Sequence, residues 1–285
     1  MNNKATYLKV KDHSVSGEEF QLLYNEELDM LETFPQPKAE NLSEYYMSEN
    51  YISHTDTKRN LLERVYHVVR NISLKRKLKL INSFNSDDKT LLDIGCGTGD
   101  FLDVAQKDNW KITGIEPNEN ARHIANSKTK HSVFEIEHLE KLEANSFDVI
   151  TLWHVLEHLP NIETHIKRFK HLLKPKGTLV IAVPNYKSYD ALYYENFWAA
   201  YDVPRHLWHF SKTSIEKIFK KEGIELKKTI PMIFDSYYVS LLSEKYKSGF
   251  MNPFKAFWTG MLSNQKAKRS KEYSSHIYIL KQQYS

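Results

Sequence analysis

The feature that most constrains the fold is a regular alternation of short apolar runs and amphipathic segments, which begins at residue 90. The apolar runs have the length and composition of strands: "TLLDIG", "KITGIEP", "SVFEIE", "FDVITLW" and "GTLVIAVP". The segments between them, such as "DFLDVAQKDN" and "NIETHIKRFKHLLKP", have helical spacing. Apolar strands that alternate with helices are typical of a parallel sheet covered on both faces. The sequence therefore predicts a doubly wound α/β sheet.

The rest of the chain flanks this alternation. Residues 1–40 are polar and irregular, and residues 42–84 have the apolar spacing of helices. After Pro184 the pattern breaks into the aromatic segment "NYKSYDALYYENFWAAYDVPRHLWHF". Regular structure resumes with the helical "SKTSIEKIFKKEG", where Thr213 and Glu216 have capping-box spacing. The final segments, "IELKKTIPMIF" and "SHIYILKQ", have the composition of strands.

These changes in pattern predict the organisation of the chain. A helical insertion near 236–261 separates the last two strands. We expect an N-terminal extension and helical cap over 1–84. An α/β domain should follow over 85–285, with lid insertions at about 185–210 and 236–272.

Composition excludes several classes of protein. The single cysteine, Cys96, rules out an intramolecular disulfide framework. A net charge of +4 is too small to indicate nucleic-acid binding by itself, and the cations of "SLKRKLK" are expected to form a solvated helix face. No run approaches the roughly 18–20 apolar residues that span a bilayer. The N-terminus lacks the apolar core of a signal peptide, so we expect a cytoplasmic protein.

A glycine-rich turn, "LLDIGCGTGDF", follows the first strand of the alternation. In open α/β sheets ligands bind beyond the carboxyl ends of the strands, and glycine lets them approach the backbone. The spacing is G-x-G-x-G, whereas dinucleotide sites use G-x-G-x-x-G. Asp93 and Asp100 add negative charge that disfavours a pyrophosphate and favours an ammonium group. Glu116, at the end of "GIEP", is placed to accept the hydroxyls of a ribose.

These segments, with "FDVITLWHVLEHLPN" and "LLKPKGTLVIAVPN", resemble the class I S-adenosylmethionine-dependent methyltransferases. The resemblance is close over 90–185 and loose from there to the C-terminus. "WHVLEHLPN" and "PRHLWHFS" are similar to bacterial small-molecule methyltransferases near the ubiquinone-biosynthesis O-methyltransferases. The resemblance implies a Rossmann-like seven-stranded sheet with "SHIYILKQ" as an antiparallel last strand, an N-terminal helical extension and aromatic lid insertions. It also implies S-adenosyl-L-methionine as cofactor and S-adenosyl-L-homocysteine as product.

The resemblance assigns a set of cofactor contacts. The turn and its acid should hold the methionine part, Glu116 the ribose, and the residues after the third strand the adenine. The predicted cofactor-binding residues are Asp93, Gly95, Cys96, Gly97, Thr98, Gly99, Glu116, Pro117, Glu137, His138, Leu139, Trp153 and His154. We expect Cys96 to be a small buried filler without thiol chemistry.

The acceptor side offers fewer signals. Methyl transfer mainly requires alignment of the acceptor with the methyl group, and an oxygen acceptor also gains from a base. The candidate bases are His154, His206 and His209. The candidate substrate contacts are Tyr193, Trp198, Arg205 and His206. An alternative for His206 and His209 is that they brace the loop through backbone hydrogen bonds.

Two segments of the sequence have features of metal sites, and we expect no metal at either of them. His154, Glu157 and His158 would share one face of a helix, as metal ligands can, but backbone and loops can satisfy their polar groups. The N-terminal segment looks like the zinc knuckle of some bacterial relatives, in which cysteine pairs hold the metal. No cysteine precedes Cys96, so we predict no zinc there. By the same analogy, nearby side chains should approach the cofactor pocket: Tyr45, Tyr46, Tyr51 and His54.

The function predicted from the sequence is methyl transfer to a small molecule, most favourably to oxygen. The alternatives are an RNA or protein methyltransferase, a catalytically silent cofactor-binding scaffold, and a nicotinamide-dependent dehydrogenase. The chain has no dedicated basic domain and no Asn/Asp-Pro-Pro-Tyr/Phe motif after the fourth strand, so we expect no nucleic-acid partner. Monomer and homodimer both remain open.

Overall fold

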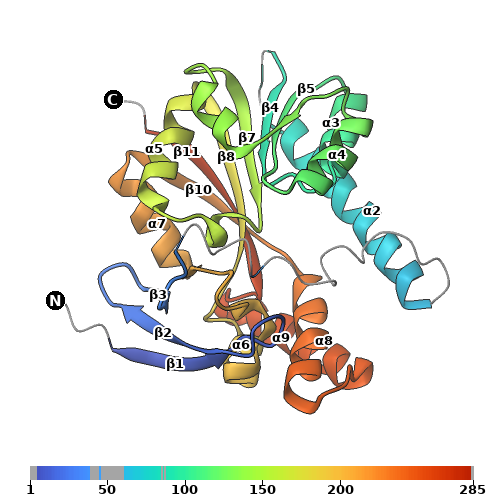
Figure 1. The fold of residues 1–285 in the computed structure, drawn as a ribbon, viewed down its shortest axis with the longest axis vertical. Helices are drawn as coiled ribbons and strands as arrows, with labels where there is room; N and C mark the ends of the chain where they lie inside the picture. Colours follow the sequence, from blue (N-terminus) through green and yellow to red (C-terminus); the bar gives the residue numbers. More distant parts are fainter. Residues whose placement is uncertain (1–4, 39–44, 46–60, 85, 87, 284–285) are drawn as a thin grey trace.

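The computed structural model describes residues 5–38, 45, 61–84, 86 and 88–283. Its larger sheet has seven strands in the order β10-β11-β8-β7-β4-β5-β6, which confirms the predicted doubly wound α/β sheet (Figure 1). The strands are β4 (Thr90–Ile94), β5 (Lys111–Ile115), β6 (Val133–Phe134), β7 (Phe147–Trp153), β8 (Leu173–Pro184), β10 (Ile224–Pro231) and β11 (Ser275–Gln282). As predicted, β11 is the last strand and runs antiparallel to β8. β11 is also antiparallel to β10.

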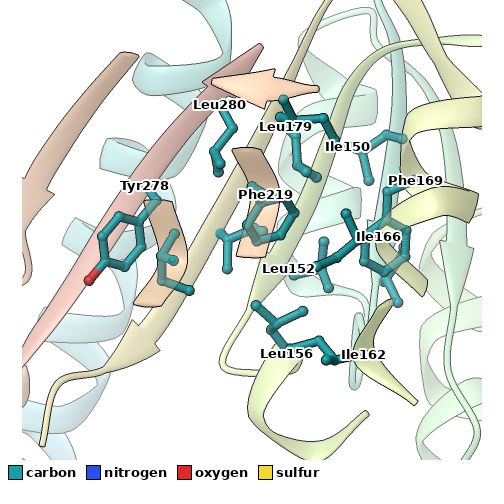
Figure 2. Close-up of a cluster of buried hydrophobic side chains, with 14 of the residues drawn as sticks. Ile150, Leu152, Leu156, Ile162, Ile166, Phe169, Leu179, Phe219, Tyr278 and Leu280 are labelled. Atoms are coloured by element: carbon teal, nitrogen blue, oxygen red, sulfur yellow. The ribbon is translucent and has the colours of Figure 1, made fainter. Parts of the chain in front are cut away.

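Alternate residues of the central strands face opposite layers of helices. Leu92, Ile150 and Ile181 join the core beneath two helices, α5 (Ile162–Leu172) and α7 (Lys212–Lys221) (Figure 2). Their neighbours Leu91, Val149 and Val180 join the core on the other face. The helices of that face are α2 (Leu61–Asn82), α3 (Asp100–Lys107) and α4 (Glu119–Lys128). Burial on both faces explains why these strands read as continuous apolar runs.

The order of the strands determines where a ligand can bind. From β4 the chain moves outward to β5 and β6, then returns to β7 and β8 on the other side of β4. This reversal opens a crevice beyond the carboxyl ends of β4 and β7, the position at which doubly wound sheets bind ligands. The glycine turn follows β4, and His154 follows β7.

The expectation of irregular structure over residues 1–40 is wrong for most of the described part. Three antiparallel strands form there and pair with a short strand from the aromatic segment, in the order β1-β2-β3-β9. They are β1 (Thr6–Lys11), β2 (Glu19–Asn25), β3 (Met30–Phe34) and β9 (Trp208–His209). The buried side chains Phe20, Leu22 and Leu31 pack against rings of the aromatic segment. β1 and β2 alternate polar and apolar residues, a pattern that is typical of half-buried strands and was given too little weight in the expectation of irregular structure.

A buried carboxylate closes the turn between β1 and β2. Asp12 is 2% exposed, and its oxygens accept hydrogen bonds from the backbone N–H groups of Ser14 (2.8 Å), Val15 (3.1 Å) and Ser16 (2.7 Å). The hydroxyls of both serines donate to it as well. Burial raises the pKa of Asp12, but these donors outweigh that effect and hold the pKa below its usual range.

Other elements differ from prediction in detail. The cap of α7 is Ser211 with Ser214, two residues before the predicted Thr213 and Glu216. The segment "SVFEIE" is a two-residue strand followed by a 3-10 helix, η2 (Ile136–Lys141). The aromatic segment contains α6 (Tyr189–Tyr194), η4 (Glu195–Phe197) and η5 (Ala199–Tyr201), and the predicted insertion is α8 (Asp235–Ser248) with α9 (Pro253–Ser270). The domain boundary at residue 85 stays a prediction.

In the part of the chain that the structure describes, no helix combines the length and apolar character needed to cross a bilayer. Tyr46, Tyr51 and His54, predicted to approach the cofactor pocket, lie outside the described residues. The hydroxyl of Tyr45 donates to Glu18, and its ring packs edge-on against Phe20. Tyr45 therefore lies against the N-terminal sheet.

Candidate functional site

The glycine turn forms a loop that leaves room above its backbone. Gly95 and Gly97 have positive φ angles of 67° and 55°, which favour glycine. A Cβ on Gly95 would lie 2.4 Å from a methyl group of Val155, so close packing also requires glycine there. A Cβ on Gly97 would have no described atom within 4 Å, so this glycine borders space that a ligand can enter.

Glu116 is oriented by the glycine turn itself. Its side chain is buried, with Oε2 accepting from the Gly97 N–H (2.8 Å) and Oε1 from the Asn118 N–H (2.9 Å). A carboxylate oxygen has two lone-pair directions, so each oxygen keeps one acceptor position for another donor. Burial raises the pKa of Glu116, and the two backbone donors oppose that shift. The geometry suits a ligand that presents two neighbouring hydroxyls.

Asp93 places a second carboxylate beneath the turn. It is 2% exposed, and its Oδ1 accepts a hydrogen bond of 2.6 Å from Thr151. Burial raises its pKa to about 7. Asp100, expected to add negative charge for an ammonium, is instead paired with Arg70 and Lys128. The negative charge available to a ligand therefore comes from Asp93 and Glu116.

A cleft of about 230 Å³ lies between the glycine turn and helix α2. Asp93 and Trp153 line it on the sheet side, and Arg70 and Lys77 line it on the helix side. The Lys77 ammonium lies 4.2 Å from the centre of the Trp153 ring. Desolvation lowers the pKa of Lys77 to about 8, against the opposing effect of Asp93 and Asp235. Because Arg70 is paired with Asp100, which also lines the cleft, the charges left for a ligand are Asp93 on the sheet side and Lys77 on the helix side.

The cations that line this cleft were not predicted from the sequence. The segment containing Lys77 was expected to be a solvated helix face, and this expectation is wrong for Lys77. Arg70, Leu74 and Lys77 have i, i+4, i+7 spacing and lie on one face of α2. That spacing was visible in the sequence, but nothing in it showed that this face lies over the glycine turn.

The other predicted cofactor residues occupy different surroundings. Cys96 lines the cleft, and burial raises the pKa of its thiol, as suits an unreactive filler. The Thr98 hydroxyl donates to Asp100, and a Cβ on Gly99 would clash with α4. Around the third strand, the His138 ring stacks at 4.0 Å on Phe134. Leu139 is buried, whereas Pro117 and Glu137 are exposed. The cofactor contacts assigned to all these residues stay predictions.

His154 is not on a helix, contrary to the expectation for "WHVLEHLP". It follows β7 with a left-handed φ of 57°, and the short helix η3 covers only Leu156–His158. Its Nε2 lies 3.2 Å from Asp235 of α8, and its Nδ1 lies 3.5 Å from Glu157. Desolvation lowers the pKa of His154, but the two carboxylates outweigh it and raise the pKa to about 10.

The Glu157 carboxylate clusters with His158 and His206, whereas the sequence pattern suggested a cluster with His154 and His158. Its carboxylate is 1% exposed, and neither oxygen has a hydrogen-bond partner among the described residues. Ligand atoms of Glu157, His158 and His206 lie within 4.8 Å of one another. Both histidines place Nδ1 against a backbone carbonyl, that of Arg205 (3.0 Å) for His158 and that of Ala200 (2.9 Å) for His206. Such a carbonyl fixes the tautomer that presents Nε2 to a metal.

The remaining acceptor-side candidates are outside this cluster, although the Arg205 carbonyl bonds His158 and the His209 ring lies 6.4 Å from the His206 ring. Trp198 is 2% exposed in the core under the N-terminal sheet, where its Nε1 donates to Asp190. His209 is bound through Nε2 to the Thr33 hydroxyl (3.0 Å). Arg205 pairs with Asp202. Tyr193 is 38% exposed at the protein surface. Their roles as acceptor contacts stay predictions, and the structure gives Trp198 and His209 packing roles.

The pKa values bear on the three candidate bases. A base at neutral pH works best with a pKa near 7. The carboxylates raise the pKa of His154 to about 10, which keeps it protonated. Burial lowers the pKa of His206 well below its usual value and that of His209 to about 3. The assignment of a histidine base stays a prediction, with these pKa values against it.

Comparison with known proteins identifies relatives of this chain. Residues 66–229, more than half of the chain, match the model of a family described as a methyltransferase domain. The ubiquinone biosynthesis O-methyltransferase of Rickettsia canadensis is 26% identical over 184 residues, which cover 60% of this chain and 78% of the relative. The demethylmenaquinone methyltransferase of Lactococcus lactis is 31% identical over 166 residues, covering 47% of this chain and 66% of the relative.

A solved structure shows the same fold. Magnesium protoporphyrin IX methyltransferase from Synechocystis PCC 6803, with bound SAH, superposes with a TM-score of 0.55 at 14% identity. The match covers 85% of this chain and 98% of that protein.

Proposed function

The chain belongs to the class I S-adenosylmethionine-dependent methyltransferases, and we propose that it moves the methyl group to an oxygen of a small-molecule acceptor. The observation that carries the cofactor assignment is Glu116, held by the glycine turn with one acceptor position left on each oxygen. Two adjacent ribose hydroxyls match that arrangement. The name of the Rickettsia canadensis relative, an O-methyltransferase, supports oxygen as the acceptor atom.

We propose that the cofactor lies along the carboxyl ends of β4 and β5. Its ribose binds Glu116, and its adenine lies toward the stacked rings of Phe134 and His138. Its methionine part enters the cleft, where the ammonium faces Asp93 and the carboxylate faces Lys77. This orientation pairs each charge of the amino acid with an opposite charge of the protein.

The transfer itself is an in-line displacement at the methyl carbon. The bond between methyl carbon and sulfur breaks, its electron pair stays on sulfur, and a new bond forms to the acceptor oxygen. The sulfonium is already activated, so the protein mainly aligns the acceptor and excludes water. The hydroxyl proton of the acceptor passes to a water molecule or a buffer base of the solvent as the new bond forms.

A divalent cation fits the cluster of Glu157, His158 and His206, which we propose as its ligands. The supporting observation is that the ligand atoms of the three residues lie within 4.8 Å of one another around a buried carboxylate, which also forms a 3.5 Å ion pair with His154. A bound cation would supply Lewis acidity that lowers the pKa of an acceptor hydroxyl. This proposal replaces the expectation of no metal. Metal analysis of the purified protein, with Glu157→Gln as the comparison, tests it independently of activity.

The proposed function is tested first by ligand-induced stabilisation. S-adenosylmethionine and S-adenosylhomocysteine should raise the melting temperature, whereas NAD should not. Isotope-labelled S-adenosylmethionine, incubated with a metabolite extract, should then yield a labelled small molecule detectable by mass spectrometry. Label in RNA or protein would favour those alternatives. Stabilisation without any labelled product would favour the silent scaffold.

A further inference from the structure

The hairpin of α8 and α9 turns its large apolar side chains away from the protein. The two helices approach closely through small residues: a Cβ on Gly260 would lie 2.8 Å from the Tyr237 ring, and the Ser236 hydroxyl donates to the Gly260 carbonyl. The buried positions of the pair include Ser236, Ser240, Ser243, Ala256, Thr259, Gly260, Ser263 and Ala267. Together with Glu244, these small residues form the buried side of the hairpin, where Ser243 and Ser263 bond the aromatic segment. Several large apolar side chains lie on the exposed side.

These outward residues form one continuous feature, which we name the apolar tip. Phe254 is 88% exposed, and Phe257 and Trp258 are each 59% exposed. Phe250 (61%) and Met251 (46%) extend the feature into the turn between the helices. Phe254, Phe257 and Trp258 are spaced three to four residues apart and therefore lie on one stripe of α9. In Figure 1 the hairpin lies at the lower end of the molecule, away from the helices that cover the large sheet.

The apolar tip lies within a stretch of positive charge. Residues 245–271 contain seven cations and no aspartate or glutamate: Lys245, Lys247, Lys255, Lys266, Lys268, Arg269 and Lys271. The whole chain has 40 cations and 36 acids, so this stretch departs strongly from the average. All seven are exposed, although Lys255 is paired to the buried Glu244. The ammonium groups of Lys247 and Lys266 also lie over tyrosine rings of the aromatic segment.

We propose that the apolar tip inserts into the interfacial region of an anionic lipid bilayer, with the cations nearest to it along the hairpin, Lys245, Lys247 and Lys255, against the lipid headgroups. Exposed Phe and Trp beside Lys and Arg is the composition of segments that lie in this interface. Anionic headgroups attract such clusters of cations. A lipid surface offers both chemistries at once, whereas a second copy of the chain would set these seven cations against the same seven.

The attachment would fix the height of the reaction site above the lipid. Helix α8 begins at Asp235, which contacts His154, and ends just before the apolar tip. Its 14 residues span about 21 Å at the usual helical rise. The proposed docking surface consists of residues of the hairpin alone, so its test is independent of the test of methyl transfer.

Vesicle binding tests the proposal with the full chain. Co-sedimentation should detect binding to vesicles of phosphatidylcholine mixed with phosphatidylglycerol, and little binding to phosphatidylcholine alone or at high salt. The double variant Phe254→Ser/Phe257→Ser should bind at least about tenfold more weakly. Leu192→Ser is the matched control, because Leu192 is also 59% exposed but lies outside the apolar tip. Trp258 fluorescence should shift to shorter wavelength on binding.

Several results would overturn the proposal. Failure to bind the mixed vesicles would do so, as would equal binding by the double variant and the wild type. Sedimentation showing a dimer that the double variant abolishes, without vesicle binding, would assign the apolar tip to a second copy. Retention of poly(U), again without vesicle binding, would assign it to RNA. Unchanged affinity of the double variant for S-adenosylhomocysteine would show that it is folded.

Discussion

Removal of the Glu116 carboxylate should weaken cofactor binding by a factor that follows from its hydrogen bonds. Each oxygen already accepts one backbone N–H, at 2.8 and 2.9 Å, which leaves one position on each for a ribose hydroxyl. Hydrogen bonds to charged groups contribute about 1.5–3 kcal/mol each. Two bonds at the lower end of that range total about 3 kcal/mol, or about a 100-fold loss of affinity in Glu116→Ala.

Isothermal titration with S-adenosylhomocysteine measures this loss directly. Glu119→Ala is the matched control, because Glu119 is a nearby exposed acid at the start of α4. 5′-Methylthioadenosine keeps the ribose but lacks the amino acid, so Glu116→Ala should weaken it by a similar factor. Glu116→Gln keeps one acceptor oxygen and should fall between the alanine variant and the wild type.

The result that refutes the ribose assignment is an affinity within threefold of the wild type in a folded Glu116→Ala protein. Folding must be checked separately, because Glu116 also accepts the N–H groups of Gly97 and Asn118. A lower melting temperature with unchanged affinity would show that Glu116 only supports the glycine turn.

Three further predictions concern charges described above. Lys77→Met should weaken the binding of S-adenosylhomocysteine at least tenfold, which is about 1.4 kcal/mol. The affinity for 5′-methylthioadenosine should not change, because that ligand has no carboxylate. Equal losses of affinity for both ligands in titration calorimetry would contradict this. Asp12→Ala should lower the free energy of unfolding by at least about 2 kcal/mol in urea, because it leaves several turn donors without an acceptor; the exposed Glu19→Ala serves as control, and a loss no larger than that of the control would exclude the role. Burial raises the pKa of Asp93 from 3.8 to about 7, so the folded protein binds its proton more tightly than the unfolded chain, and without ligand stability should fall by up to about 1.4 kcal/mol per unit as pH rises from about 4 to 7. Asp93→Asn should remove that decline in a series of urea titrations, and an identical decline in the variant would disprove the assignment.

The large sheet could be predicted because its information is local. Strands buried on both faces are rich in apolar and β-branched residues, and "FDVITLW" and "SHIYILKQ" coincide with β7 and β11. The N-terminal sheet was not predicted from the sequence, because β1 and β2 are polar on one face and the sheet packs against residues more than 150 positions later. No pattern within residues 1–40 contains that partner.

The same distinction divides the site. Asp93, the glycines and Glu116 were predictable because each lies at a fixed position in or just after the end of a strand. Lys77 was not predictable, because its position in the cleft depends on how α2 packs over the glycine turn. For Glu157, helical spacing suggested His154 as a ligand beside His158. The left-handed backbone at His154 breaks that helix, and the loop after η5 brings His206 to the cluster instead.

The pairing of β3 with β9 has a consequence for the order in which the protein assembles during translation. The Thr33 hydroxyl bonds residues 173 and 176 positions later, His206 and His209. At bacterial and eukaryotic elongation rates, roughly 10 to 35 seconds separate the synthesis of these partners. During that interval the edge of β3 has no strand beside it on the nascent chain, and unpaired edges invite association with other chains. The N-terminal sheet therefore begins first and is completed late, when the aromatic segment leaves the ribosome.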